Sequence, residues 1–140
     1  MDTSDVRIKS FSQIPITNLF SYCVLEEPNL SSRKTMEDFT ISEQALTDDN
    51  RWSLFCVLDG HGGAQVASYT KAKYPKILKQ ILSDDSNNAT VEEKISQSID
   101  CLNAQLFERD AYENGSTFCG VLLDQARRVY YTINIGDSRV

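Results

Sequence analysis

Several features that define large classes of protein are missing from this 140-residue chain. It contains no run of about 18 consecutive apolar residues, so no membrane insertion is expected. The N-terminus lacks the basic-then-apolar pattern of a secretory signal sequence. The four cysteines show no C-x-x-C spacing, which argues against a zinc site and favours free thiols in a reducing, intracellular setting. We therefore expect a location in the cytoplasm, or also in the nucleus.

Positive charge is also scarce. The chain has 14 Lys and Arg against 20 Asp and Glu, which gives a net charge of −6 and a pI near 4.7. Phosphates would be repelled by this average field, so a broad nucleic-acid surface is not expected. A hydrophobic content of 41% with 24% charged residues is typical of a single folded domain.

Hydrophobic periodicity predicts strands, then two helices, then strands. Apolar residues recur at helical spacing between residues 66 and 82 and again from residue 91. Alternating or continuous apolar runs predict strands elsewhere, and this order favours an α+β fold with helices laid on a mostly antiparallel sheet. The expected strands cover residues 21–25, 38–46, 52–59, 117–123 and 128–135.

Four residues should shape the helices. Pro75 lacks an N–H donor and is predicted to kink or restart the first helix. Thr90 and Glu93 match a capping box at the start of the second helix. Gly115 is a plausible C-cap for that helix.

The segment "DGHGG", residues 59–63, holds the only histidine of the chain. One interpretation is a turn, since Asp-Gly is common at chain reversals. An oxyanion loop of the lipase type would need a G-x-S-x-G nucleophile motif, which this sequence lacks. A Ser-His-Asp triad stays possible, although nothing marks a nucleophilic serine.

A metal site is the third interpretation of this segment. Asp59 follows an apolar strand, and Gly60 lets its carbonyl approach a cation. Glu37, Asp38 and Asp137 add carboxylates at other strand or loop ends. These hard oxygen donors, with one histidine and no paired cysteines, favour Mg²⁺ or Mn²⁺.

Four stretches together resemble the metal-dependent serine/threonine protein phosphatases of the type 2C class. They are "RKTMED" (33–38), "FCVLDGHGG" (55–63), "GSTFCGVLL" (115–123) and "NIGDSR" (134–139), in the order found in that family. The resemblance spans most of the chain after residue 20. It implies a β-sandwich flanked by antiparallel helix pairs, in α-β-β-α layers, of which this chain carries the N-terminal portion, incomplete at the C-terminus.

The resemblance also implies metal ligands. Asp59 corresponds to the acid that bridges two ions, and Glu37 with the Gly60 carbonyl completes one of the two sites. Asp38 resembles an acid that holds a water on the metal, and Asp137 resembles a ligand of a further, weaker ion. The complete domain would hold two or more Mg²⁺ or Mn²⁺ ions.

The same resemblance implies catalytic roles. Arg33 corresponds to the residue that clamps the phosphate, and His61 to the general acid that protonates the departing serine or threonine oxygen. Thr117 matches a threonine of the family motif, for which we expect a structural role. The implied substrates are proteins carrying phosphoserine or phosphothreonine, and the complete protein is expected to be monomeric.

The family's domain continues past "GDSR", through later aspartates that complete the first metal site. We therefore expect residues 1–20 to be an N-terminal extension and residues 21–140 to be a partial catalytic domain. Weak metal binding and little turnover follow for the 140-residue chain. The alternatives are a shortened, inactive relative that binds phosphoproteins or regulates a phosphatase, and a binding module that shares only the architecture.

Overall fold

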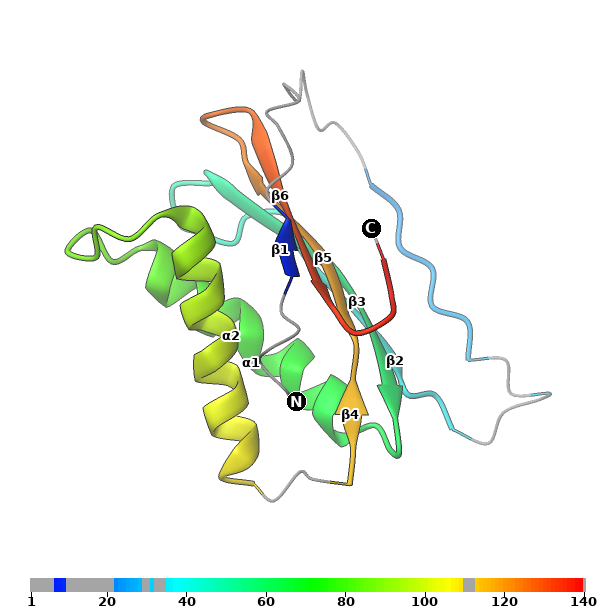
Figure 1. Cartoon of the computed structure of the whole chain (residues 1–140). Coiled ribbons are helices and arrows are strands. Elements are labelled where there is room, and N and C mark those ends of the chain that lie inside the picture. Colours follow the sequence, from blue (N-terminus) through cyan, green and yellow to red (C-terminus); the bar gives the residue numbers. More distant parts are fainter. Residues whose placement is uncertain (1–6, 10–21, 29–30, 32–34, 110–112, 140) are drawn as a thin grey trace.

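The computed structural model describes residues 7–9, 22–28, 31, 35–109 and 113–139. They form one sheet with two helices packed on one of its faces, while residues 22–28 and the segment after the last strand lie on the other side (Figure 1). This arrangement confirms the predicted α+β class.

The sheet has the strand order β1-β6-β5-β3-β2, with β4 added beside β3. Every strand pairing among the described residues is antiparallel. The strands are β1 (Arg7–Lys9), β2 (Asp38–Glu43), β3 (Trp52–His61), β4 (Gly115–Ser116), β5 (Phe118–Asp124) and β6 (Val129–Ile135).

Strand β3 lies between β5 and the edge strand β2, and its side chains alternate between the two faces of the sheet. Leu54 and Leu58 are fully buried on the helix side. Val57 on the other face is 53% exposed, and Asp59 and His61 follow it on the same face. The period of two that a strand imposes therefore sends apolar side chains into the core and chemically active ones outward.

The two helices, α1 (Gln65–Leu82) and α2 (Val91–Phe107), pack against each other and against this buried face. Tyr74 of α1 meets Phe118 of β5 edge to face, with ring centroids 4.8 Å apart. The Tyr74 hydroxyl lies 3.0 Å from that of Ser98 on α2, so its polar end is bonded inside the core. Burial raises the pKa of Tyr74, which keeps this hydroxyl neutral.

The capping box of α2 is confirmed. The Thr90 hydroxyl accepts from the Glu93 N–H, and the Glu93 carboxylate accepts from the Thr90 N–H. The helix ends earlier than the glycine pattern suggested, because Glu108 is the C-cap, and its N–H donates to Ala104 O. The prediction of Gly115 as C-cap was wrong, since Gly115 belongs to β4.

Two further expectations differ from the structure. Helix α1 continues without interruption through Pro75, held on both sides by buried residues such as Tyr74 and Leu78, so the predicted restart does not occur. Residues 22–25 belong to no strand, although the Tyr22 ring contacts Phe55 of β3 in a tilted arrangement, with ring centroids 4.7 Å apart. Tyr22 therefore reaches the sheet through its side chain.

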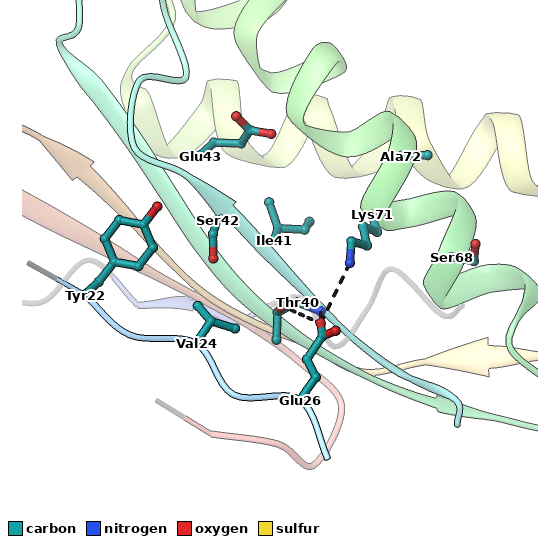
Figure 2. A pocket seen from close by; sticks show the side chains of 10 residues that line it. All are labelled: Tyr22, Val24, Glu26, Thr40, Ile41, Ser42, Glu43, Ser68, Lys71 and Ala72. Atoms are coloured by element: carbon teal, nitrogen blue, oxygen red, sulfur yellow. Dashed lines mark hydrogen bonds and ion pairs between the residues drawn. The ribbon is translucent and has the colours of Figure 1, made fainter. Parts of the chain in front are cut away.

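The outer edge of β2 is partly closed by Glu26, as Figure 2 shows. Its carboxylate accepts from both the backbone N–H and the hydroxyl of Thr40, and lies 3.8 Å from Lys71 Nζ of α1. A groove of about 760 Å³ opens beside this contact, between β2, α1 and residues 22–26. The groove does not include the candidate acids of the "DGHGG" segment.

The four cysteines are free thiols. Cys56 and Cys119 are buried in the sheet, whereas Cys23 and Cys101 are exposed. Burial raises the pKa of both sheet thiols, which makes them unreactive core residues. No helix among the described residues has the length and apolar character needed to cross a membrane.

Candidate active site

The candidate site forms where β2 begins and β3 ends, because the two strands are antiparallel. Asp38 is the direct cross-strand partner of Asp59. The neighbouring Gly60 N–H donates to Glu37 O at 3.2 Å, so Asp38 and Asp59 occupy the intervening, non-hydrogen-bonded position. Such positions bring the two Cα atoms to about 4.5 Å and the side chains closest together.

This placement is electrostatically unfavourable for two carboxylates. Both aspartates are exposed, and like charges directly opposite one another destabilise a sheet. Packing of the sheet does not require two acids at this position. A cation between the two strands would offset this repulsion.

Glu37 contributes a third carboxylate from the residue before β2. Its Oε1 accepts from the Thr35 hydroxyl at 3.2 Å, and its Oε2 accepts from the Gly63 N–H at 3.3 Å. Gly63 directly precedes the start of α1, where the unpaired N–H groups and the helix dipole favour negative charge. The carboxylate is thus oriented by the "HGG" turn.

The absence of a side chain at Gly60 lets the end of β3 lie close to Glu37 and to α1. A Cβ at this position would collide with the Glu37 carbonyl oxygen and lie 3.3 Å from Ala67 Cβ of α1. The strand end therefore sits directly between Glu37 and the helix. Any side chain at residue 60 would separate the acids that the turn brings together.

Thr117 supports Asp59 from the other side of β3. Its N–H donates to Asp59 O at 2.9 Å, and its hydroxyl accepts from the Asp59 N–H at 3.3 Å. The Thr117 carbonyl is occupied by the Ser116 hydroxyl, so the side chain replaces it in the ladder. The expected structural role of Thr117 thus has a specific form: it holds the backbone of the central acid.

The "GDSR" segment reaches the site through the same threonine. The Thr117 and Ser138 hydroxyls lie 2.8 Å apart. Gly136 has a φ of +93°, and a Cβ there would lie 3.1 Å from Thr117 Cγ2, so the turn carrying Asp137 is pressed onto Thr117. Asp137 itself is exposed.

His61 is the last residue of β3 and is exposed on the same face as Asp59. It pairs with Gly115 of β4, and its imidazole lies over that glycine. Sequence reasoning did not single out this contact or the role of Ser138. Gly115 belongs to the stretch "GSTFCGVLL" and Ser138 to "NIGDSR", and these two stretches were the only signal in the sequence for either residue.

These residues have donor atoms that suit metal binding, but too few of them gather at one point. The donors are hard oxygens, which suit Mg²⁺ or Mn²⁺. Within the ranges that the structure describes, no three Asp, Glu, His or Cys side chains cluster closely enough to hold an ion. Arg33, the predicted phosphate clamp, lies outside the described residues. The described residues therefore do not form a metal-binding cluster by themselves.

Comparison with known sequences identifies the class of protein to which this fold and these acids belong. The sequence pattern of the family described as "Protein phosphatase 2C" matches residues 26–140. The chain belongs to this family.

Similar proteins agree with the family assignment. The chain is 31% identical over 114 residues to "Protein phosphatase 1L" of Bos taurus, which covers 76% of the chain and 31% of that protein. It is 28% identical over 131 residues to "Protein phosphatase 2C homolog 1" of Saccharomyces cerevisiae, covering 84% of the chain and 47% of that protein. The chain thus spans less than half the length of these curated relatives.

A solved structure with a similar fold is described as "Structure of a C.elegans sex determining protein". It matches with a TM-score of 0.62 and 15% sequence identity, over 76% of this chain and 32% of that one. At this identity the likeness concerns the fold alone. It supports the arrangement of sheet and helices described above.

Proposed function

We propose that this chain is part of the catalytic domain of a metal-dependent protein phosphatase that hydrolyses phosphoserine and phosphothreonine in proteins. The observation that carries the proposal is the exposed Asp38–Asp59 pair, directly opposed across β2 and β3, with Glu37 beside it. Family membership supports the same reaction class, since several relatives are named as protein phosphatases.

Glu37, Asp59 and the Gly60 carbonyl would hold Mg²⁺ or Mn²⁺, and Asp38 would hold water beside the ion. Two ions in such a site lower the pKa of bound water and neutralise charge on the phosphoryl oxygens. Asp137 would bind a further ion from the exposed turn after β6. The described residues alone do not supply a full set of ligands.

The remaining chemistry belongs to side chains. His61 would donate a proton to the departing serine or threonine oxygen, and its place at the end of β3, two residues beyond Asp59, supports this role. The planar guanidinium of Arg33 would hold two phosphate oxygens and fix the direction of attack. No covalent intermediate is needed in this scheme.

The proposal is tested by Mn²⁺-dependent hydrolysis of a phosphothreonine peptide, with Mn²⁺ binding measured by calorimetry. Asp59→Asn should abolish turnover and weaken binding. Asp100→Asn, which makes the same change at an exposed position of α2, is the matched control and should alter neither. Asp59-dependent binding without turnover would indicate an incomplete phosphatase site. Absence of Mn²⁺ binding would contradict the proposal and favour the protein-binding alternative.

A further inference from the structure

Two short segments of the chain lie against each other at the candidate site. One is the turn 61–63 at the end of β3, and the other is the segment 113–115 that leads into β4. Backbone pairing joins them, since His61 is the register partner of Gly115 and Gly60 that of Ser116. The loops therefore share one local frame.

Contact between the imidazole and Gly115 is the closest of these pairs. A Cβ added at Gly115 would lie 2.5 Å from His61 Cε1 and 3.2 Å from Cδ2, and would overlap Nε2. The ring thus occupies the space that a side chain at residue 115 would need. The backbone of Gly115 therefore limits where the His61 ring can lie.

The other pairs reinforce this arrangement. A Cβ at Gly62 would collide with the Glu113 carbonyl 2.5 Å away, and one at Gly63 would overlap Asn114 Oδ1. Gly63 also donates its N–H to Glu37 Oε2. The segment 113–115 therefore rests against the turn that holds both the imidazole and a carboxylate.

Conformation does not explain the glycine at 115. Gly62, Gly63 and Gly136 have positive φ, whereas Gly115 does not. An alanine could adopt the backbone of Gly115 without strain, and at such sites alanine usually stabilises a protein. A side chain at residue 115 would instead compete for space with the His61 ring, the group nearest to the position of its Cβ.

We propose that Gly115 is a positioning residue for His61: its missing side chain leaves room for the imidazole, and its backbone fixes the ring's place at the end of β3. The consequence for catalysis rests on the proposed function, in which His61 donates a proton. The contact itself does not, so the two can be tested separately.

The contact is tested on the 140-residue chain by NMR, because His61 is its only histidine and gives a unique imidazole signal. We expect a nuclear Overhauser effect between the His61 Cε1 proton and the Gly115 α-protons. We also expect Gly115→Ala to shift the imidazole resonance. Asp100→Asn, a change at an exposed position of α2, should leave it nearly unchanged. A missing Overhauser effect in the unsubstituted chain would overturn the proposal, even if Gly115→Ala failed to fold.

A double-mutant cycle gives a second, activity-free measurement. Gly115→Ala should lower the urea midpoint of the unsubstituted chain but have a smaller effect in a His61→Ala background, where no ring opposes the new methyl group. Equal losses in the two backgrounds would overturn the proposal. A smaller loss supports it, whether or not the chain hydrolyses phosphate esters.

Kinetics then test the link to the reaction. Displacing the general acid should slow hydrolysis of a phosphothreonine peptide by about 10²-fold. Hydrolysis of p-nitrophenyl phosphate should fall much less, since its leaving group departs without a proton. Equal losses for both substrates would overturn the positioning role in catalysis. Coupling between residues 61 and 115 in a chain that shows no Mn²⁺ binding would support the contact and count against the proposed function.

Discussion

Arg51 and Asp124 form a bidentate ion pair at the end of the sheet remote from His61. Arg51 Nε lies 3.0 Å from Oδ1, and its terminal nitrogen lies 2.6 Å from Oδ2. The Asp124 side chain is fully buried, and Oδ1 also accepts from the N–H groups of Ala126 and Arg127 in the β5–β6 turn. This one carboxylate therefore joins the start of β3 to the hairpin.

The Asp124 network should make stability depend on pH. Burial alone would raise the pKa of Asp124, but the hydrogen bonds from Arg51 and the turn outweigh it and leave the pKa below its ordinary value. The stabilisation is therefore present above the unfolded pKa, about 3.9, and is lost as the pH falls through the folded pKa. Urea midpoints between pH 6 and pH 2 should fall less steeply for Asp124→Asn, and parallel slopes would contradict this account.

Removing the partner should be costly at neutral pH. Arg51→Ala leaves a buried carboxylate without its main counter-charge, and we expect a loss of about 2–3 kcal/mol, below the usual 3–5 because Arg51 is 34% exposed. Urea unfolding measures the loss. Arg128→Ala, which changes an exposed arginine of the same turn, serves as the control and should change stability little.

Thr90 should contribute to stability as the N-cap of α2. Thr90→Ala removes the acceptor of the Glu93 N–H, and we expect a loss of about 1 kcal/mol in the free energy of unfolding. Thr90→Ser keeps the hydroxyl and should lose much less. An alanine variant as stable as the serine variant would show that the capping box contributes nothing measurable.

Thr117 should matter through its hydroxyl more than its methyl group. Thr117→Val leaves the Asp59 N–H and the Ser138 hydroxyl without this partner, and we expect a loss of about 1–3 kcal/mol together with weaker Mn²⁺ binding. Thr117→Ser retains the hydroxyl and should preserve binding. Equal Mn²⁺ affinities of the valine and serine variants, measured by calorimetry, would exclude this role.

Gly60→Ala should disturb the acids at the start of β2. The added methyl group meets a backbone carbonyl that cannot move aside independently, so we expect a loss of about 1–3 kcal/mol. The Gly63 amide resonance should also change, because its acceptor Glu37 is displaced. An unchanged urea midpoint would mean that β2 and α1 separate easily at this end.

The main helices and strands could be predicted because the spacing of their apolar residues follows from which side chains face the core. Val91, Ile95 and Ile99 recur at helical spacing, and the alternation of β6 is visible in its residues. Strands β1 and β4 could not be predicted, since three and two residues carry no periodic signal, and they exist through pairing with β6 and β3. Residues 22–25 show the reverse, a strand-like pattern without a strand.

The candidate acids could be named from sequence, but their relationship could not. That Asp38 faces Asp59 depends on the β2–β3 register, which is set by the intervening turn, where Asn50 has a φ of +57°. Gly115 illustrates a second limit. A glycine that ends a helix and a glycine that makes room for a ring look identical in a single sequence.

The alternation of β3 also determines which insertions and deletions the chain can accept. Removing one residue between Trp52 and Leu58 would rotate Asp59 and His61 toward the helices and turn Leu58 outward, so a single deletion would remove the site and the core together. The polar loop 83–89 carries no such constraint, because it connects two helices outside the sheet. Length variation in this protein should therefore be confined to its loops, while the ten residues of β3 keep a fixed count.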